Sequence, residues 1–119
     1  MSLQTEFPFL LPKGYIGEEG TLQRKGLMRL ATARDEIQPL RDARVKENEA
    51  YLTVIVLSRV ITELGTLQQV TPHTIEGLFV EDLAYLQDLY ARINFGDEAA
   101  NEEGGGQSPP LEVLSSGLP

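Results

Sequence analysis

AYLTVIVLSRVITELG, which spans Ala50–Gly65, has the densest apolar content in the chain. Its β-branched run at residues 53–56 would suit a strand, because such side chains are stiff at χ1. The apolar pattern nevertheless continues for about four turns, which is longer than a typical strand. It predicts a central helix over residues 49–64, with one apolar face at four-residue spacing: Leu52, Val56, Val60 and Leu64.

Both ends of this predicted helix carry suitable residues. Asn48 can cap the first turn, and Gly65 can take the left-handed conformation that commonly follows a helix. Ile55, Leu57 and Ile61 widen the apolar stripe beyond what one partner helix would cover. Either another element of the fold covers the remainder, or the remainder binds another protein.

The residues before this helix predict a β-hairpin over residues 6–31. Apolar residues alternate along Glu6–Leu11, and Pro8 restricts this strand to an edge or an irregular position. Pro12–Gly20, PKGYIGEEG, contains three glycines and is the predicted loop. The second strand, Thr21–Leu30, would place three apolar residues on one face: Leu22, Met28 and Leu30. A hairpin is marginal alone, so it must pack against helices.

A short helix is predicted directly after the hairpin. Thr32 and Asp35 have the spacing of a capping box, with Asp in place of the usual Glu or Gln. The helix should cover residues 33–38, because Pro39 disfavours the helical conformation of the residue before it. The charged stretch Arg41–Glu49 is expected to be an irregular or partly helical connector.

Two more helices are predicted after the central one. Thr71 and Pro72 combine a hydroxyl cap with proline at the first helical position, which predicts a brief helix over residues 72–78. The sequence VEDLAYLQDLYARIN, residues 80–94, has the apolar stripe of an amphipathic helix.

The last part of the chain differs in composition from the rest. Residues 96–119 contain five acidic residues, no basic residue and many Gly, Ser and Pro, which predicts an acidic, disordered tail. LEVL, at 111–114, is either part of an inert tail or a short docking motif. The expected architecture is therefore α+β and mostly helical. One folded domain, residues 1–95, contains an N-terminal β-hairpin followed by a compact bundle of three to four helices.

Bulk composition limits the classes of function. The chain has 119 residues, no cysteine and a net charge of −8. The lack of cysteine excludes disulfides and thiolate chemistry and favours a cytoplasmic location. The negative charge would repel phosphate backbones, so no nucleic-acid partner is expected. No apolar run is long enough to span a bilayer, so no membrane partner is expected either.

Residues that usually carry catalysis are sparse. His73 is the single histidine, and no serine lies in a nucleophile-elbow context. Glu81 and Asp82 are adjacent and therefore point to different sides of a helix, where they complement the helix dipole. The hairpin glycines match neither a phosphate-binding loop nor a dinucleotide fingerprint. The sequence predicts no catalytic, cofactor or metal site, and hence no enzyme.

A small basic cluster lies on the second predicted strand, at Arg24, Lys25 and Arg29. The simplest interpretation is an edge strand that charge protects from unwanted pairing. The alternative is a contact with an acidic partner or with the acidic tail of the chain itself.

The order of short motifs along the chain is distinctive. An extended LPKG segment and a glycine-rich loop lead into GLMRLATARDE, and an apolar helix ends in ITELG. A helix that begins with TP is followed by IEGLFVEDLAYLQDLYARIN. In this order the chain resembles the phage tail assembly chaperone family, and more narrowly the small tail assembly proteins of phages and phage-derived contractile injection systems.

Two family patterns carry the resemblance, which covers roughly residues 5–95. Met28, Arg29 and Thr32 match an MR-x-x-T-type segment on the family's hairpin. The family's C-terminal helix follows L-x-x-x-D-x-x-x-L, which is matched by Leu78, Asp82 and Leu86.

The resemblance implies a non-catalytic chaperone or adaptor that holds a tape-measure or tube protein soluble during assembly. The alternative is a structural baseplate or tube-associated component that remains in the particle, and self-association is a further expected interaction. A small enzyme or regulator outside this family would require a clustered site. The residues expected to contact the partner lie on the wide apolar stripes: Leu57, Ile61, Leu83 and Tyr90.

Overall fold

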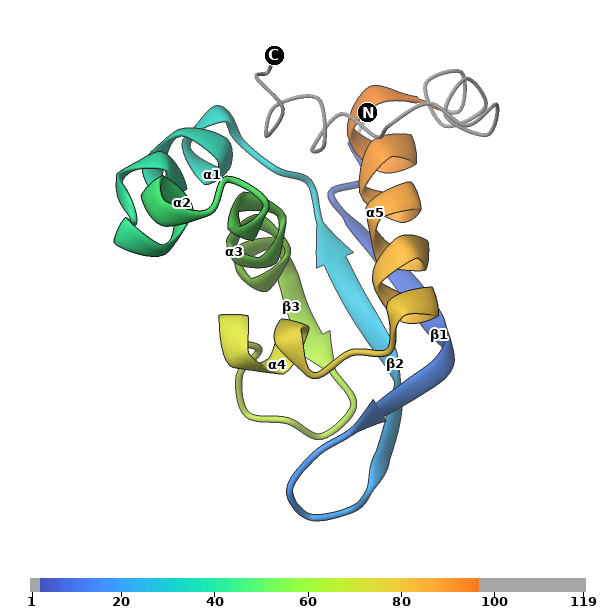
Figure 1. Ribbon diagram of the computed structural model, residues 1–119. Coiled ribbons are helices and arrows are strands. Elements are labelled where there is room, and N and C mark those ends of the chain that lie inside the picture. The colour runs from blue at the N-terminus through green and yellow to red at the C-terminus, as the bar shows by residue number, and fades with distance from the viewer. Residues whose placement is uncertain (1–2, 97–119) are drawn as a thin grey trace.

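A three-stranded antiparallel sheet organises the computed structural model, which describes residues 3–96 (Figure 1). Its strands are β1 (Glu6–Ile16), β2 (Leu22–Arg29) and β3 (Ile61–Leu64), with β2 between the other two. The predicted hairpin is confirmed as β1 and β2, and the third strand was not predicted. The predicted tail, residues 96–119, lies outside the described residues apart from Gly96.

Strand β1 extends further than the sequence predicts. Its regular pairing with β2 runs to Leu10, shifts register, and resumes at Tyr15 opposite Gln23. The predicted loop is therefore wrong in its first half, because residues 12–16 continue the strand through an irregularity. The turn itself is closed by a 2.9 Å hydrogen bond from the Gly20 amide to the Gly17 carbonyl.

The predicted central helix is wrong over its last four residues. Helix α3 is Tyr51–Val60, and the chain then passes directly into β3, which pairs with β2. The β-branched residues at this junction suit a strand, and pairing with β2 satisfies backbone groups that would otherwise form the last helical turn. Gly65 does have a positive φ of 57°, but it follows a strand rather than a helix.

The start of α3 also differs from the prediction by two residues. Ala50 occupies the N-cap position, although the Asn48 side chain accepts a hydrogen bond from the Ala50 amide at 3.1 Å. The Asn48 carbonyl accepts a bond from the Tyr51 amide at 2.9 Å. Asn48 thus orders the chain before the helix without capping it.

The remaining helices follow the predicted start signals closely. They are α1 (Ala33–Ile37), the 3₁₀ helix η1 (Gln38–Arg41), α2 (Ala43–Glu47), α4 (Pro72–Glu76) and α5 (Val80–Phe95). Asp35 accepts a 2.8 Å hydrogen bond from the Thr32 amide, as a capping box requires. The Thr71 side chain accepts from the Thr74 amide at 3.3 Å. The charged connector is partly helical, as expected, because it contains α2.

One apolar core joins the helices to the sheet, so the hairpin packs against the helices as the sequence predicts. Phe9 and Leu11 alternate inward along β1, as predicted, and Met28 faces them from β2. Leu22 is instead half exposed, because the register shift separates the hairpin tip from the rest of the sheet. The helices contribute their own buried side chains: Val45, Leu52, Ile55, Val56, Leu57, Val60, Ile75, Leu86, Leu89 and Tyr90.

The predicted basic cluster is not a single surface feature. Strand β2 is central rather than an edge, and its cations make different contacts. The Arg24 Nε donates to the Leu11 carbonyl at 2.8 Å. Arg29 instead forms a bidentate ion pair with Asp35, with N–O distances of 2.8 and 2.9 Å.

The buried Asp35 carboxylate links three elements of the fold. It accepts hydrogen bonds from Arg29 on β2, from the Thr32 amide before α1, and from Arg59 on α3 at 3.1 Å. Arg29, above all, lowers the pKa of Asp35 well below its usual range, against the opposing effect of burial. A buried carboxylate is tolerated here because both of its oxygens accept hydrogen bonds, most of them from cations.

The Asp35 cluster should make stability fall in acid. A carboxyl group whose pKa is lowered by folding stabilises the protein above its unfolded pKa of about 4, and this contribution is lost as pH falls below that value. Between about pH 5 and pH 2.5, the free energy of unfolding measured with urea should therefore fall more steeply for the wild type than for Asp35→Asn. Asp88→Asn, at a half-exposed site on α5, is the matched control and should keep the wild-type slope. Equal slopes for wild type and Asp35→Asn would contradict this role.

Candidate protein-binding surface

Three of the four residues predicted to contact a partner are buried. The exposed fractions of Leu57, Ile61 and Tyr90 are 0%, 4% and 1%, and Leu83 is partly buried against the same core. Helix α3 packs chiefly against α4 and α1, and β3 pairs with β2. In this conformation these side chains stabilise the fold, and Leu57, Ile61 and Tyr90 expose almost no surface.

Tyr90 has a polar contact within this buried setting. Its hydroxyl donates a hydrogen bond to a Glu36 carboxylate oxygen. Burial and this carboxylate together raise the pKa of Tyr90 far above its usual value. Tyr90 therefore remains protonated and connects α5 to α1.

Exposed apolar side chains occur on the hairpin and at the start of α5, two parts of the fold that Asp82 joins. Ile16 and Leu22 are cross-strand partners beside the turn, and each is about half exposed. Phe79 and Val80 lie at the start of α5, and Val80 is 82% exposed. We call these four residues, together with the two hollows described below, the hairpin-end surface. Other exposed apolar residues lie elsewhere: Leu3, Leu10, Ile37, Leu40 and Phe95.

Asp82 holds the two halves of this surface together. It is fully buried, and its carboxylate accepts hydrogen bonds from the amides of Lys13 and Gly14 at 2.9 and 2.8 Å. These amides belong to the irregular part of β1, where the pairing with β2 is interrupted. Next to them, Lys13 forms a 3.1 Å ion pair with Glu81. The first turn of α5 is thereby fixed against β1.

Asp82 therefore does more than complement the helix dipole, which was its predicted role. A carboxylate that accepts two backbone amides makes strong, charge-assisted hydrogen bonds. Two more contacts complete the junction. The Tyr85 hydroxyl lies 3.4 Å from the Leu10 amide, and Gly14, whose φ is 108°, leaves no room for a Cβ beneath Leu22.

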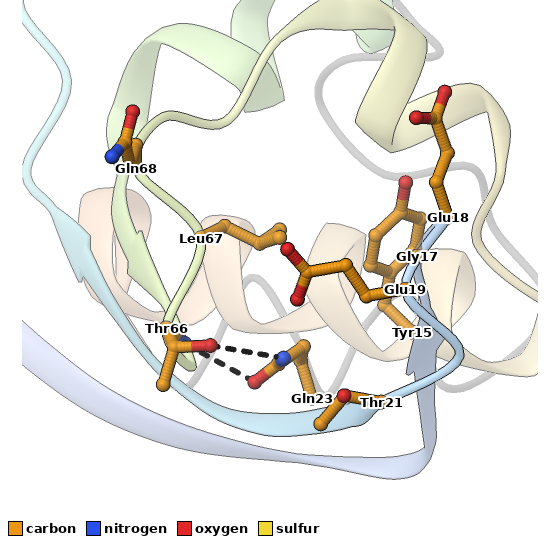
Figure 2. A pocket seen from close by; sticks show the side chains of 9 residues that line it. All are labelled: Tyr15, Gly17, Glu18, Glu19, Thr21, Gln23, Thr66, Leu67 and Gln68. Atoms are coloured by element: carbon orange, nitrogen blue, oxygen red, sulfur yellow. Dashed lines mark hydrogen bonds between the residues drawn. The ribbon is translucent and has the colours of Figure 1, made fainter.

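Two open hollows lie on either side of the hairpin turn. The larger, of about 530 Å³, lies between the turn and the segment that follows β3 (Figure 2). The smaller, of about 390 Å³, lies between the turn and α4. Tyr15, Gly17 and Glu18 line both hollows, so the turn forms a ridge between them.

The floor of the larger hollow is rigid. Gln23 is buried, and its side-chain amide both donates to the Thr66 hydroxyl and accepts from the Thr66 amide, each at 3.1 Å (Figure 2). Gly65 approaches the Gln23 side chain so closely that any Cβ would overlap it. This pair of hydrogen bonds joins β2 to the segment after β3.

Exposed carboxylates surround both hollows. Glu18 and Glu19 lie on the turn, and Glu76 lies at the end of α4, where it accepts a hydrogen bond from the Tyr51 hydroxyl. His73 is exposed and lines the smaller hollow. Within residues 3–96 there is no group of three or more His, Cys, Asp or Glu side chains arranged to hold a metal ion.

Comparison of the chain with protein-family models, characterised proteins and solved structures finds no match. Among the described residues, no helix is both long enough and apolar enough to cross a membrane. The surface itself and the motif order in the sequence are therefore the observations that bear on function.

Substitutions should separate the predicted contact residues from the exposed ones. Leu57→Ala should lower the free energy of unfolding by about 2–5 kcal/mol, because it leaves a cavity in the core. Val80→Ala removes an exposed side chain and should change it by less than about 0.5 kcal/mol. Urea denaturation of both variants measures the difference, and a small effect for Leu57→Ala would show that this side chain is not a core residue.

Proposed function

We propose that this protein is a non-catalytic assembly chaperone or adaptor. In this role it binds a tape-measure or tube protein during assembly of a phage tail or contractile injection system. The proposal is supported by the motif order in the sequence and by the hairpin-end surface. Exposed apolar side chains grouped beside hollows are typical of sites that bind other proteins.

The residues that carry the family resemblance have structural roles in this chain. Met28 is fully buried, Arg29 pairs with Asp35, and Thr32 precedes α1 as its N-cap. On α5, Asp82 anchors β1 and Leu86 is buried. The resemblance therefore supports a shared scaffold, and partner contacts are expected at exposed positions between the motif residues.

The hairpin-end surface is the single observation that carries the proposal. Its four apolar side chains lie on the hairpin and at the start of α5, which Asp82 fixes to each other. A preorganised apolar surface loses little conformational freedom on binding, which favours affinity for an exposed apolar segment of another protein. Such segments are what a chaperone must cover before its partner assembles.

A second candidate function is a structural component that stays in the particle. Strand β3 ends the sheet, because within the described residues it pairs only with β2. Thr62 and Glu63 are exposed on this strand. An open strand edge can accept a further strand from a neighbouring subunit, as repeated assemblies often require.

Co-expression tests the chaperone proposal. The tube or tape-measure protein from the same gene neighbourhood should become more soluble with the wild type, and Ile16→Asp/Val80→Asp should abolish this gain, because it places charge on the apolar surface. Ile37→Asp/Leu40→Asp is the matched control at another exposed apolar site and should behave as the wild type. Soluble yield of the partner is the measurement.

Two results would count against the chaperone proposal. One is an unchanged partner solubility when the wild type is present. The other is stoichiometric recovery of this protein by mass spectrometry of purified particles, which would favour the structural component.

A further inference from the structure

We infer that the hairpin-end surface binds a polypeptide segment whose apolar side chains are flanked by Lys or Arg. This inference rests on the proposed function, because it names the chemistry of the partner at the same surface. It adds a requirement that a purely apolar surface would not impose. The charges around the two hollows impose this requirement.

The carboxylates at this surface are not neutralised by cations of the described chain. Glu18, Glu19 and Glu76 are exposed, and none of them takes part in an ion pair within residues 3–96. Lys13, on β1 next to the first turn of α5, is already paired with Glu81. The hollows therefore lie in a negative local potential, which attracts a cationic segment.

The geometry favours contact with several residues of one segment. Glu18 lines both hollows, Glu19 lines the larger one, and Glu76 lines the smaller one from the side of α4. Leu67 lines the larger hollow on the side away from the turn, and Figure 2 shows it facing Glu19. A segment lying across the ridge would place apolar side chains beside Ile16 and basic side chains beside the glutamates.

The other exposed apolar pair has the opposite charge environment. Ile37 and Leu40 share the α1–η1 stretch with Arg34 and Arg41, which are exposed and make no ion pair in the described part of the chain. Residues three or four apart on a helix are neighbours, so both arginines flank Ile37. The two apolar surfaces therefore select partners of opposite charge.

The test uses a pair of fluorescent amphipathic peptides of about eighteen residues, roughly five helical turns. Both carry leucines on one face. The other face carries lysines in one peptide and glutamates in the matched control peptide. Affinity is measured by fluorescence anisotropy with the full chain at about 50 mM salt, where screening is weak. The lysine peptide should bind, and its affinity should fall as salt rises.

Charge variants distinguish this surface from the general negative charge of the chain. Glu18→Gln/Glu19→Gln/Glu76→Gln should weaken binding of the lysine peptide by about fivefold or more, because three exposed pairs are lost. Glu6→Gln/Glu47→Gln/Glu49→Gln removes the same charge from exposed positions elsewhere and should have an effect of less than about twofold. Circular dichroism checks that both variants are folded.

The inference would be overturned if the two triple variants lost equal affinity for the lysine peptide, or if the two peptides bound equally well. The proposed function would survive that result if co-expression with the wild type still raised partner solubility and Ile16→Asp/Val80→Asp still abolished the gain. A different result is failure of the co-expression test together with a loss of peptide affinity specific to the Glu18/Glu19/Glu76 variant. That result would leave a site that binds cationic segments but has no chaperone role.

Discussion

The buried carboxylate of Asp82 is the interaction on which the arrangement of the sheet and the C-terminal helix depends. It lies in the first turn of α5 and accepts two amides from the irregular part of β1. At that point β1 is not paired with β2, so these amides have no strand partner. Without Asp82, two backbone donors would lose their hydrogen bonds at the junction, which is costly in a folded protein. The same contact fixes the first turn of α5 against the hairpin, whose turn lines a hollow together with α4.

Much of the local structure follows from signals that are readable in the sequence. The Thr32 and Thr71 caps, the hairpin and the long amphipathic helix α5 all occur where local residue chemistry predicts them. The junction of α3 and β3 does not, because a β-branched apolar run is compatible with both structures. Pairing with β2 decides between them, and that partner is more than thirty residues away along the chain.

The candidate surface was harder to predict than the fold, for a related reason. The width of the central apolar stripe suggested exposed contact residues, whereas Leu57 and Ile61 are buried in the core that the helices share with the sheet. The exposed residues, Ile16 and Val80, lie at element ends where no periodic pattern marks them. The position of Ile16 relative to the start of α5 depends on the long-range Asp82 contact.

These features connect stability to the proposed role. The buried ion pairs of Asp35 and the hydrogen bonds of Asp82 fix the scaffold, and the exposed apolar and acidic side chains at the hairpin end are carried by it. The residues that stabilise the fold are therefore different from the residues that are available to a partner. Rigid support for a small surface is the property that the proposed adaptor needs.

Amide hydrogen exchange, resolved by NMR, tests the central role of Asp82 most directly. Lys13 is an exposed residue in an irregular edge strand, so its amide would exchange rapidly unless it is hydrogen-bonded. If Asp82 holds the junction closed, the amides of Lys13 and Gly14 should be protected as strongly as the paired amides of β2. Exchange of these two amides at the rate of the exposed hairpin turn would contradict the account.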